Sequence, residues 1–193
     1  MNRRQSHPRP HLSLAVMVLA ACVAGCGSSA ATTSAPPPPL SVLPASALPR
    51  LAPVDSPLTA TELTHDAPIP GFADQLAAWG YQRGTQRVFR GNSGDFTNVV
   101  SRTLEFGSSS GAAAYVRLVG TRVADFFGSG SKVAALSSAG RRGYLIQAAP
   151  CGCHLETPVM LAVLSAGRRV TWLYGTGRGA RVAGLRALLA QAP

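Results

Sequence analysis

Residues 162–174, with the sequence AVLSAGRRVTWLY, decide the fold. An apolar run leads into the turn Ser-Ala-Gly-Arg-Arg, and a second run of β-forming residues follows, which is the pattern of a β-hairpin. Residues 134–146, AALSSAGRRGYLI, repeat this pattern. Gly167 and Gly140 supply the positive φ angle that a tight hairpin turn requires. The second half of the chain is therefore predicted to form two antiparallel hairpins.

Residues 98–106, NVVSRTLEF, alternate with the period of a half-buried strand. The apolar face of this strand holds Val100, Leu104 and Phe106, and the polar face holds Ser101, Thr103 and Glu105. Arg102 interrupts the apolar face. We expect it either at a sheet edge or as the buried partner of an acid.

The remaining segments complete the expected order. Residues 81–91 predict a further strand, and apolar residues at helical spacing predict helices at about 72–79, 108–127 and 179–191. Ser109 or Ser110 is expected to cap the second of these helices. Helix, strand, strand, helix, two hairpins and helix make an α+β domain, an antiparallel sheet with helices packed on one or both faces.

The N-terminus carries a different signal. Basic residues precede about a dozen apolar or small ones, in the proportions of a secretory signal peptide, and the stretch ends in LAACVAGCGSS, residues 19–29. Val-Ala-Gly-Cys, ending at Cys26, resembles the lipobox of bacterial lipoproteins. The resemblance implies cleavage before Cys26 and attachment of lipid to its thiol. Leu-Ala-Ala-Cys, ending at Cys22, fits the same pattern and is the alternative site.

These signals predict three parts of the chain. Residues 1–25 are a lipoprotein signal peptide, residues 26–70 are the lipidated cysteine with an Ala/Ser/Pro-rich disordered tether, and residues 71–193 are the extracytoplasmic domain. The order of elements in 71–193 is similar to that of small uncharacterised extracytoplasmic lipoproteins of actinobacteria. Some of these have sandwiches similar to the PsbP-like fold, and we expect such a sandwich for residues 71–193. The resemblance implies no catalytic residues.

The chain is basic, with 18 Lys and Arg against 8 Asp and Glu and a net charge of +10. Such a protein at a membrane is attracted to anionic head groups and wall polymers. The expected location is the extracytoplasmic face of the cell membrane, with the membrane as partner through the N-terminal lipid. That compartment argues against nucleic acid as a partner.

The densest group of reactive side chains is APCGCHLETP, residues 149–158, with Cys151, Cys153 and His154. Three interpretations stay open. An oxidising compartment favours a disulfide between the two cysteines. A short, strained pair beside a histidine also fits thiol–disulfide exchange. Two thiolates and an imidazole are the soft ligands that Cu(I) or Zn(II) prefers.

The hairpin turns carry paired arginines, Arg141-Arg142 and Arg168-Arg169. If the hairpins lie side by side, the four could form an anion-binding cluster for phosphate or carboxylate groups. The alternative is that charges at turn tips keep the sheet ends soluble. Gly175, Gly177 and Gly179 lie between a strand and a helix, and we interpret them as connector glycines rather than a phosphate loop.

The sequence shows no catalytic set. After removal of the signal peptide the histidines are His65 and His154, there is no Gly-x-Ser-x-Gly, and no close pair of acids suggests glycosidase chemistry. We therefore expect a non-catalytic, lipid-anchored envelope protein without cofactor or resident metal, whose domain binds a small ligand or an envelope protein. The alternative is a thiol-redox or copper- or zinc-handling protein using Cys151, Cys153 and His154.

Overall fold

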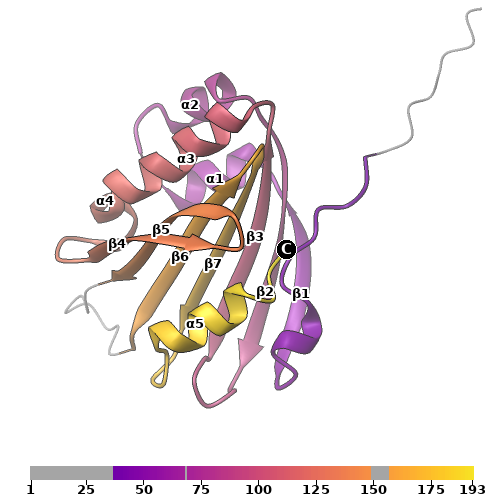
Figure 1. The fold of residues 1–193 in the computed structure, drawn as a ribbon, viewed down its shortest axis with the longest axis vertical. Coiled ribbons are helices and arrows are strands. Elements are labelled where there is room, and N and C mark those ends of the chain that lie inside the picture. The colour runs from indigo at the N-terminus through magenta and orange to yellow at the C-terminus, as the bar shows by residue number, and fades with distance from the viewer. Residues whose placement is uncertain (1–36, 68, 149–156) are drawn as a thin grey trace, which may run out of the picture. The chain divides into compact units, whose positions relative to one another are not determined.

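The computed structural model describes residues 37–67, 69–148 and 157–193, and the second of its two units, Pro38–Pro193, contains the sheet and the helices. That unit is built on one seven-stranded antiparallel sheet with the strand order β1-β2-β3-β7-β6-β5-β4 (Figure 1). The expected α+β class with an antiparallel sheet is confirmed. Among the described residues, no helix has the length and hydropathy needed to cross a bilayer.

The strands of the sheet are 7 to 11 residues long. Their bounds are β1 Leu51–Leu58, β2 Tyr81–Gly91, β3 Asn98–Phe106, β4 Lys132–Ser138, β5 Arg141–Ala148, β6 Val159–Ala166 and β7 Arg169–Thr176. The pairing of β3 with β7 joins the N-terminal strands to the two hairpins, so the last strand lies at the centre of the sheet.

The two predicted hairpins are confirmed as β4–β5 and β6–β7. In the first, Ala139 and Gly140 have φ angles of 49° and 75°, so a two-residue turn with both central residues at positive φ joins the strands. In the second, Gly167 has a φ of 53°. Because β5 pairs with β6, both turns lie side by side at one end of the sheet.

Helices α1 Ala60–Asp66, α2 Phe72–Ala78, α3 Ser109–Thr121 and α4 Val123–Phe127 pack on one face of the sheet, which we call the helical face (Figure 1). The core there includes Phe72, Leu104, Phe106, Tyr115, Val116 and Trp172. Ser108 caps α3 by accepting a hydrogen bond from the Gly111 amide at 3.0 Å, one position ahead of the expected caps. The single helix predicted for 108–127 is interrupted at Arg122.

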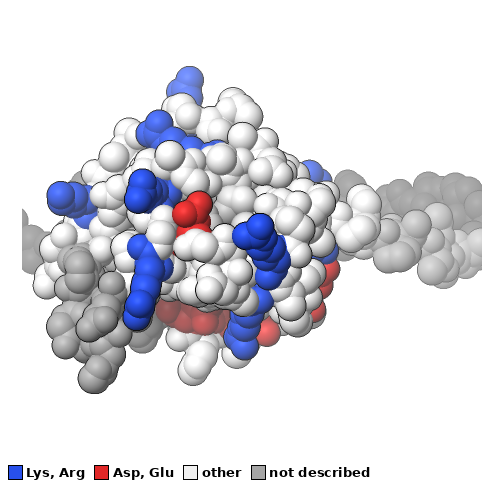
Figure 2. Space-filling view, turned by 90° about the horizontal axis from the view of Figure 1, so that it is seen from below, with Lys and Arg blue, Asp and Glu red and all other residues white. Residues whose placement is uncertain are grey.

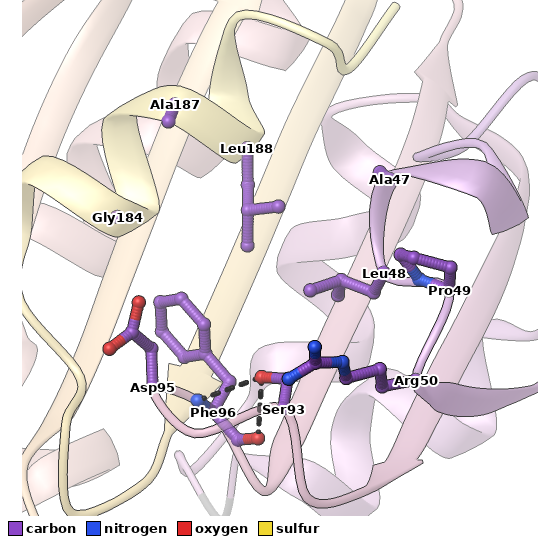
Figure 3. Close-up of a pocket in the computed structure, with 10 residues that line it drawn as sticks. All are labelled: Ala47, Leu48, Pro49, Arg50, Ser93, Asp95, Phe96, Gly184, Ala187 and Leu188. Carbon is purple, nitrogen blue, oxygen red and sulfur yellow. Dashed lines mark hydrogen bonds between the residues drawn. The ribbon is translucent and has the colours of Figure 1, made fainter.

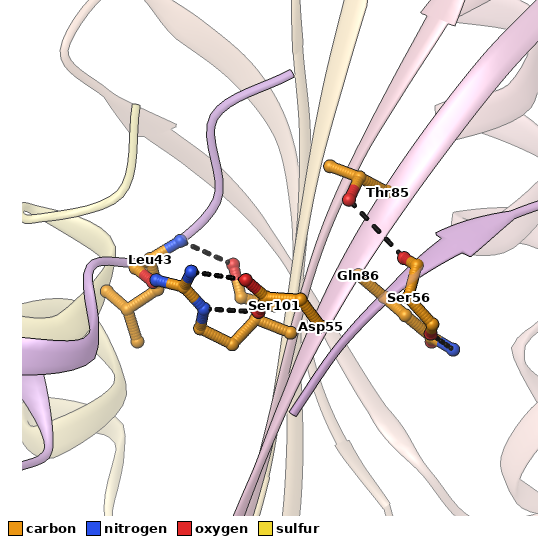
Figure 4. Close-up of polar contacts among 7 residues, drawn as sticks. Leu43, Asp55, Ser56, Thr85, Gln86 and Ser101 are labelled. Carbon is orange, nitrogen blue, oxygen red and sulfur yellow. Dashed lines mark hydrogen bonds and ion pairs between the residues drawn. The ribbon is translucent and has the colours of Figure 1, made fainter. Parts of the chain in front are cut away.

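The other face, which we call the α5 face, is covered by α5 Val182–Leu189 and by residues 38–48, which we call the N-terminal segment and which include the short 3₁₀ helix η1 Ala45–Ala47. The segment is held by side chains of β3, because an irregular backbone on a sheet needs side-chain partners for its polar groups. The Leu43 amide donates to Ser101 Oγ at 3.0 Å (Figure 4). Thr103 Oγ1 donates to the Ser41 carbonyl at 2.6 Å.

The polar face predicted for β3 is therefore buried rather than exposed to solvent. Ser101, Thr103 and Glu105 are only 1%, 5% and 8% exposed. Ser101 and Thr103 form hydrogen bonds with the backbone of the N-terminal segment, and Glu105 pairs with Arg83. Arg102, on the helical face, forms an ion pair with Asp66 of α1 and is half-buried, which confirms the second of its two expected placements.

The structure also differs from the predicted boundary between tether and domain. β1 and α1 both lie within residues 26–70, and the compact unit begins at Pro38. Pro53 and Pro57 made this strand look like linker, yet a strand at a sheet edge tolerates proline because one row of its amides faces outward. Thr59 and Glu62 form a capping box that starts α1.

Candidate functional site

A half-open pocket of about 320 Å³ lies on the α5 face, between α5, the end of η1 with the residues that lead into β1, and the β2–β3 turn. We call it the α5 pocket. Figure 3 shows Leu48 from one side and Leu188 from α5 both directed toward the space beside the Phe96 ring. The pocket is lined by Ala47, Leu48, Pro49, Arg50, Ser93, Asp95, Phe96, Gly184, Ala187 and Leu188.

The position of Phe96 is fixed by its own turn and by glycines around its ring. Ser93 Oγ donates to the Phe96 carbonyl at 2.9 Å and accepts from the Phe96 amide at 3.1 Å (Figure 3). A β-carbon on Gly175 would lie 2.7 Å from the ring, and one on Gly184 would lie 3.2 Å from it. These glycines therefore admit the aromatic side chain that forms the floor of the pocket.

The glycines after β7 also bring the connecting loop against the β2–β3 turn. A β-carbon on Gly177 would lie 2.4 Å from the Asp95 carbonyl oxygen, and one on Gly179 would lie 2.8 Å from the Gly94 carbonyl oxygen. Gly177 and Gly179 thus let the loop after β7 approach the backbone of the β2–β3 turn closely, at the end of the sheet where the α5 pocket lies.

The rim of the α5 pocket is charged. Arg50 and Asp95 line it from different segments, both are exposed, and neither forms an ion pair with another described residue. Arg178 and Arg181 lie in the loop that packs on the Asp95 turn and are also exposed. Figure 2 views this end of the molecule and shows separate basic side chains around an acidic one. An apolar floor with a charged rim fits a small amphipathic molecule.

A second polar feature, which we call the Glu105 cluster, lies at the opposite end of the α5 face. Glu105 Oε2 accepts from Arg83 Nε at 2.7 Å, and Oε1 lies 3.8 Å from Arg168 and 3.9 Å from Arg169. The hydrogen bond from Arg83, with the charges of all three arginines, lowers the pKa of the Glu105 carboxyl. Arg83 also donates to the Pro38 carbonyl at 2.8 Å, so the cluster holds the start of the N-terminal segment.

The four turn arginines do not form the single predicted cluster, although the hairpins do lie side by side. Arg141 is buried, and its guanidinium donates to the carbonyls of Leu189 at 2.9 Å, Ala192 at 3.1 Å and Pro193 at 2.7 Å. Burial lowers the pKa of Arg141. It anchors the C-terminal end of α5.

Arg142 points to the other face. Successive strand residues alternate between faces, so Arg141 on the α5 face sends Arg142 to the helical face, where it lines a groove beside α3. Arg168 and Arg169 share Glu105 as a neighbour. Because side chains alternate along β5, Arg141 and Arg142 lie on opposite faces of the sheet although they are adjacent in sequence.

The helical face carries a half-buried polar network around Arg102. Arg102 Nε donates to Gln86 Oε1 at 3.0 Å, its Nη2 pairs with Asp66, and its guanidinium lies 4.8 Å from the centre of the Trp172 ring. Gln86 in turn donates to Ser56 Oγ at 3.1 Å (Figure 4). The network ties β1, β2 and β3 to α1 and is satisfied within itself.

Several predicted site residues fall outside the part of the chain that the structure describes. These are the lipidation candidates Cys22 and Cys26 and the reactive group Cys151, Cys153 and His154. Their interpretations stay predictions. Within the described ranges, no group of three His, Cys, Asp or Glu side chains could hold a metal ion. His65 is described and is exposed at the end of α1.

The α5 pocket has no counterpart among the sites predicted from sequence. Its lining comes from residues 47–50, 93–96 and 184–188, which are brought together only by the fold. The one local signal was Phe96, a large apolar residue within a polar turn, GNSGDF. In the structure this side chain is buried, with Phe96 only 3% exposed.

Comparisons with known proteins add little. No family model matches the chain, and no curated protein matches it. Among solved structures, the chain is similar to the extracellular domain of PknH from Mycobacterium tuberculosis, with 12% sequence identity and a TM-score of 0.37. The match covers 72% of this chain and 80% of that one. A TM-score this low supports no inference about the topology or the function of this chain.

Proposed function

We propose that this chain is a lipid-anchored, non-catalytic protein of the cell envelope whose folded domain binds a small ligand in the α5 pocket. The anchoring part rests on the N-terminal sequence, in which Cys26, with Cys22 as the alternative, follows a secretory-type apolar run. We also propose that the domain is a sandwich similar to the PsbP-like fold, because the order of its strands and helices fits such a sandwich.

The observation that carries the ligand-binding part is the α5 pocket itself. Its volume of about 320 Å³ lies at the lower end of the range for small-molecule sites. Leu48, Phe96 and Leu188 offer apolar contact, and the charges of Arg50 and Asp95 at the rim offer orientation. The ligand is therefore small, with an apolar body and a polar or charged group that stays near solvent.

Binding can be tested with the fluorescent probe anilinonaphthalene sulfonate, which has an apolar body and an anionic group. Ala187→Phe places an aromatic ring at the pocket wall, and Ala183→Phe places the same ring on an exposed position of α5 that does not line the pocket. We expect Ala187→Phe to weaken binding by about tenfold or more, equivalent to about 1.4 kcal/mol, and Ala183→Phe to leave it unchanged. Equal affinity of all three proteins would contradict the pocket as the site.

Anchoring can be tested by expressing the full chain in a bacterium supplied with a labelled palmitate analogue. Cys26→Ser is expected to abolish labelling and release the protein from the membrane fraction, whereas Cys22→Ser is the matched control that keeps the label. The reverse pattern assigns the lipid to Cys22. Label that persists in both variants, or is absent from the unsubstituted protein, would contradict a lipid anchor.

A further inference from the structure

We propose that the β4 edge of the sheet binds an extended, acidic segment of a partner protein, which adds as an eighth strand and places carboxylates beside Arg117 and Arg142. This interaction surface is separate from the α5 pocket and does not depend on ligand binding there. It rests on an open strand edge and on a neighbouring basic groove.

The two edges of the sheet, β1 and β4, are unlike each other (Figure 1). β1 carries Pro53 and Pro57, and proline on an outer strand blocks the pairing of another strand. β4 has the sequence KVAALSS, with no proline and with Lys132 as its one charge. Residues 132–135 of β4 are all exposed. The β4 edge therefore lacks the devices that keep β1 from pairing.

The turn geometry shows which β4 amides face outward. Ser138 and Arg141 flank the two-residue turn and form a hydrogen-bonded pair, and such pairs alternate along an antiparallel ladder. The amides of Val133, Ala135 and Ser137 consequently point away from β5. These three residues also place their side chains on the helical face, since Ser137 lies opposite Arg142 and cross-strand partners share a face.

A groove of about 310 Å³ lies on that face next to β4, which we call the α3 groove. Arg117 of α3 and Arg142 of β5 line it, both are exposed, and neither forms an ion pair with a residue in the described ranges. Tyr144 and Ser165 add hydroxyl groups to the lining. Two guanidinium groups in a groove whose described lining holds no acid make a site for carboxylates.

The strand at the edge leaves room for a partner's side chains to reach this groove. Of the three β4 residues on the helical face, Ala135 and Ser137, which lie opposite Tyr144 and Arg142, are small. An added strand would lie two strand spacings, about 10 Å, from β5. A glutamate on the added strand and the long side chain of Arg142 span that gap over Ser137. Strand pairing would supply affinity, and the arginines would select acidic segments.

Charge also argues against a second copy of this chain as the occupant. Its own β4 contains no acid, and Lys132 would add a further positive charge to the arginines. Without the proposed signal peptide, which holds Arg3, Arg4 and Arg9, the chain has 15 Lys and Arg against 8 Asp and Glu, a net charge of +7, so two copies repel each other. An acidic segment of another protein is complementary to the same surface.

The test uses two synthetic heptapeptides and the full chain. One peptide alternates glutamate with threonine and valine, and the other has lysine in place of each glutamate. We expect the glutamate peptide to bind about tenfold or more tightly than the lysine peptide by calorimetry, with the difference shrinking as salt screens the charges. Arg142→Glu leaves Arg117 facing a carboxylate in the groove, so we expect it to abolish the preference for the glutamate peptide while the backbone of the strand edge stays unchanged.

Ala135→Pro tests the strand edge, because it removes an outward amide while leaving the hydrogen bonds to β5 in place, and Ala135→Ser is the matched control. We expect Ala135→Pro to abolish peptide binding and Ala135→Ser to retain it, with both variants keeping the probe binding at the α5 pocket. The proposal is overturned if neither peptide binds, if both bind equally, or if Ala135→Pro binds as before. Sedimentation that shows a dimer lost on Ala135→Pro would assign the edge to a second copy and also overturn it.

Discussion

Replacing Glu105 by glutamine removes one negative charge from the Glu105 cluster and keeps the shape of the side chain. Glu105 is 8% exposed as a residue, and its carboxylate accepts a hydrogen bond from Arg83 at 2.7 Å, with Arg168 and Arg169 at 3.8 and 3.9 Å. The amide oxygen of glutamine still accepts a hydrogen bond from Arg83, so the substitution isolates the contribution of charge.

The magnitude follows from these contacts. A hydrogen bond between charged groups contributes about 1 kcal/mol more than one with a neutral acceptor. The two longer pairs involve arginines whose side chains are 57% and 60% exposed, and each adds about 0.5 kcal/mol at most. Glu105→Gln should therefore lower the free energy of unfolding by about 1–2 kcal/mol at neutral pH.

The pH dependence identifies the cause. The arginines lower the folded-state pKa of Glu105 below its ordinary value of 4.5. Its contribution is thus complete above that value and is lost as the pH falls through the lowered pKa. Urea unfolding of both proteins from about pH 7 to about pH 3 should show the difference in stability shrinking toward zero. The other carboxyls titrate in both proteins and cancel. A difference that does not change with pH would refute the electrostatic explanation.

Three further substitutions test other features by urea unfolding. Arg141→Met removes the donors that hold the Leu189 end of α5 and should cost about 3 kcal/mol; unchanged amide exchange in α5 would contradict that anchor. Gly120→Ala should destabilise by about 1–3 kcal/mol although alanine favours helices, because its β-carbon would lie 2.4 Å from the Tyr144 ring; a gain in stability would show that the ring moves freely. Ala139→Gly should stabilise by about 0.5 kcal/mol, since Ala139 has a φ of 49°; a loss would mean that the turn is not strained.

The parts of the fold that local sequence determines could be predicted. Gly140 and Gly167 mark turns between runs of β-forming residues, so both hairpins were evident without knowledge of the rest of the chain. The stripe of apolar residues in α3 was equally clear. In each case the signal and the structure it specifies lie within about twenty residues.

The parts that depend on distant contacts could not be predicted. The burial of Ser101 comes from Leu43, which is 58 residues away in sequence, and nothing in the alternation of β3 reveals that cover. The prolines of β1 led us to predict a tether there, because composition alone does not distinguish an edge strand from a linker. The α5 pocket is lined by three segments that are far apart in sequence. Arg141 is buried because carbonyl groups at the end of α5 accept its hydrogen bonds.

The course of the N-terminal segment gives the domain a mechanical property. The segment is fastened in sequence by Pro38 to Arg83, Ser41 to Thr103 and Leu43 to Ser101, and then forms one wall of the α5 pocket through Leu48. Tension applied to the chain ahead of residue 38 would load these fastenings one after another, so the segment would peel rather than shear. Sustained pulling would reach Leu48 last and remove that wall of the α5 pocket.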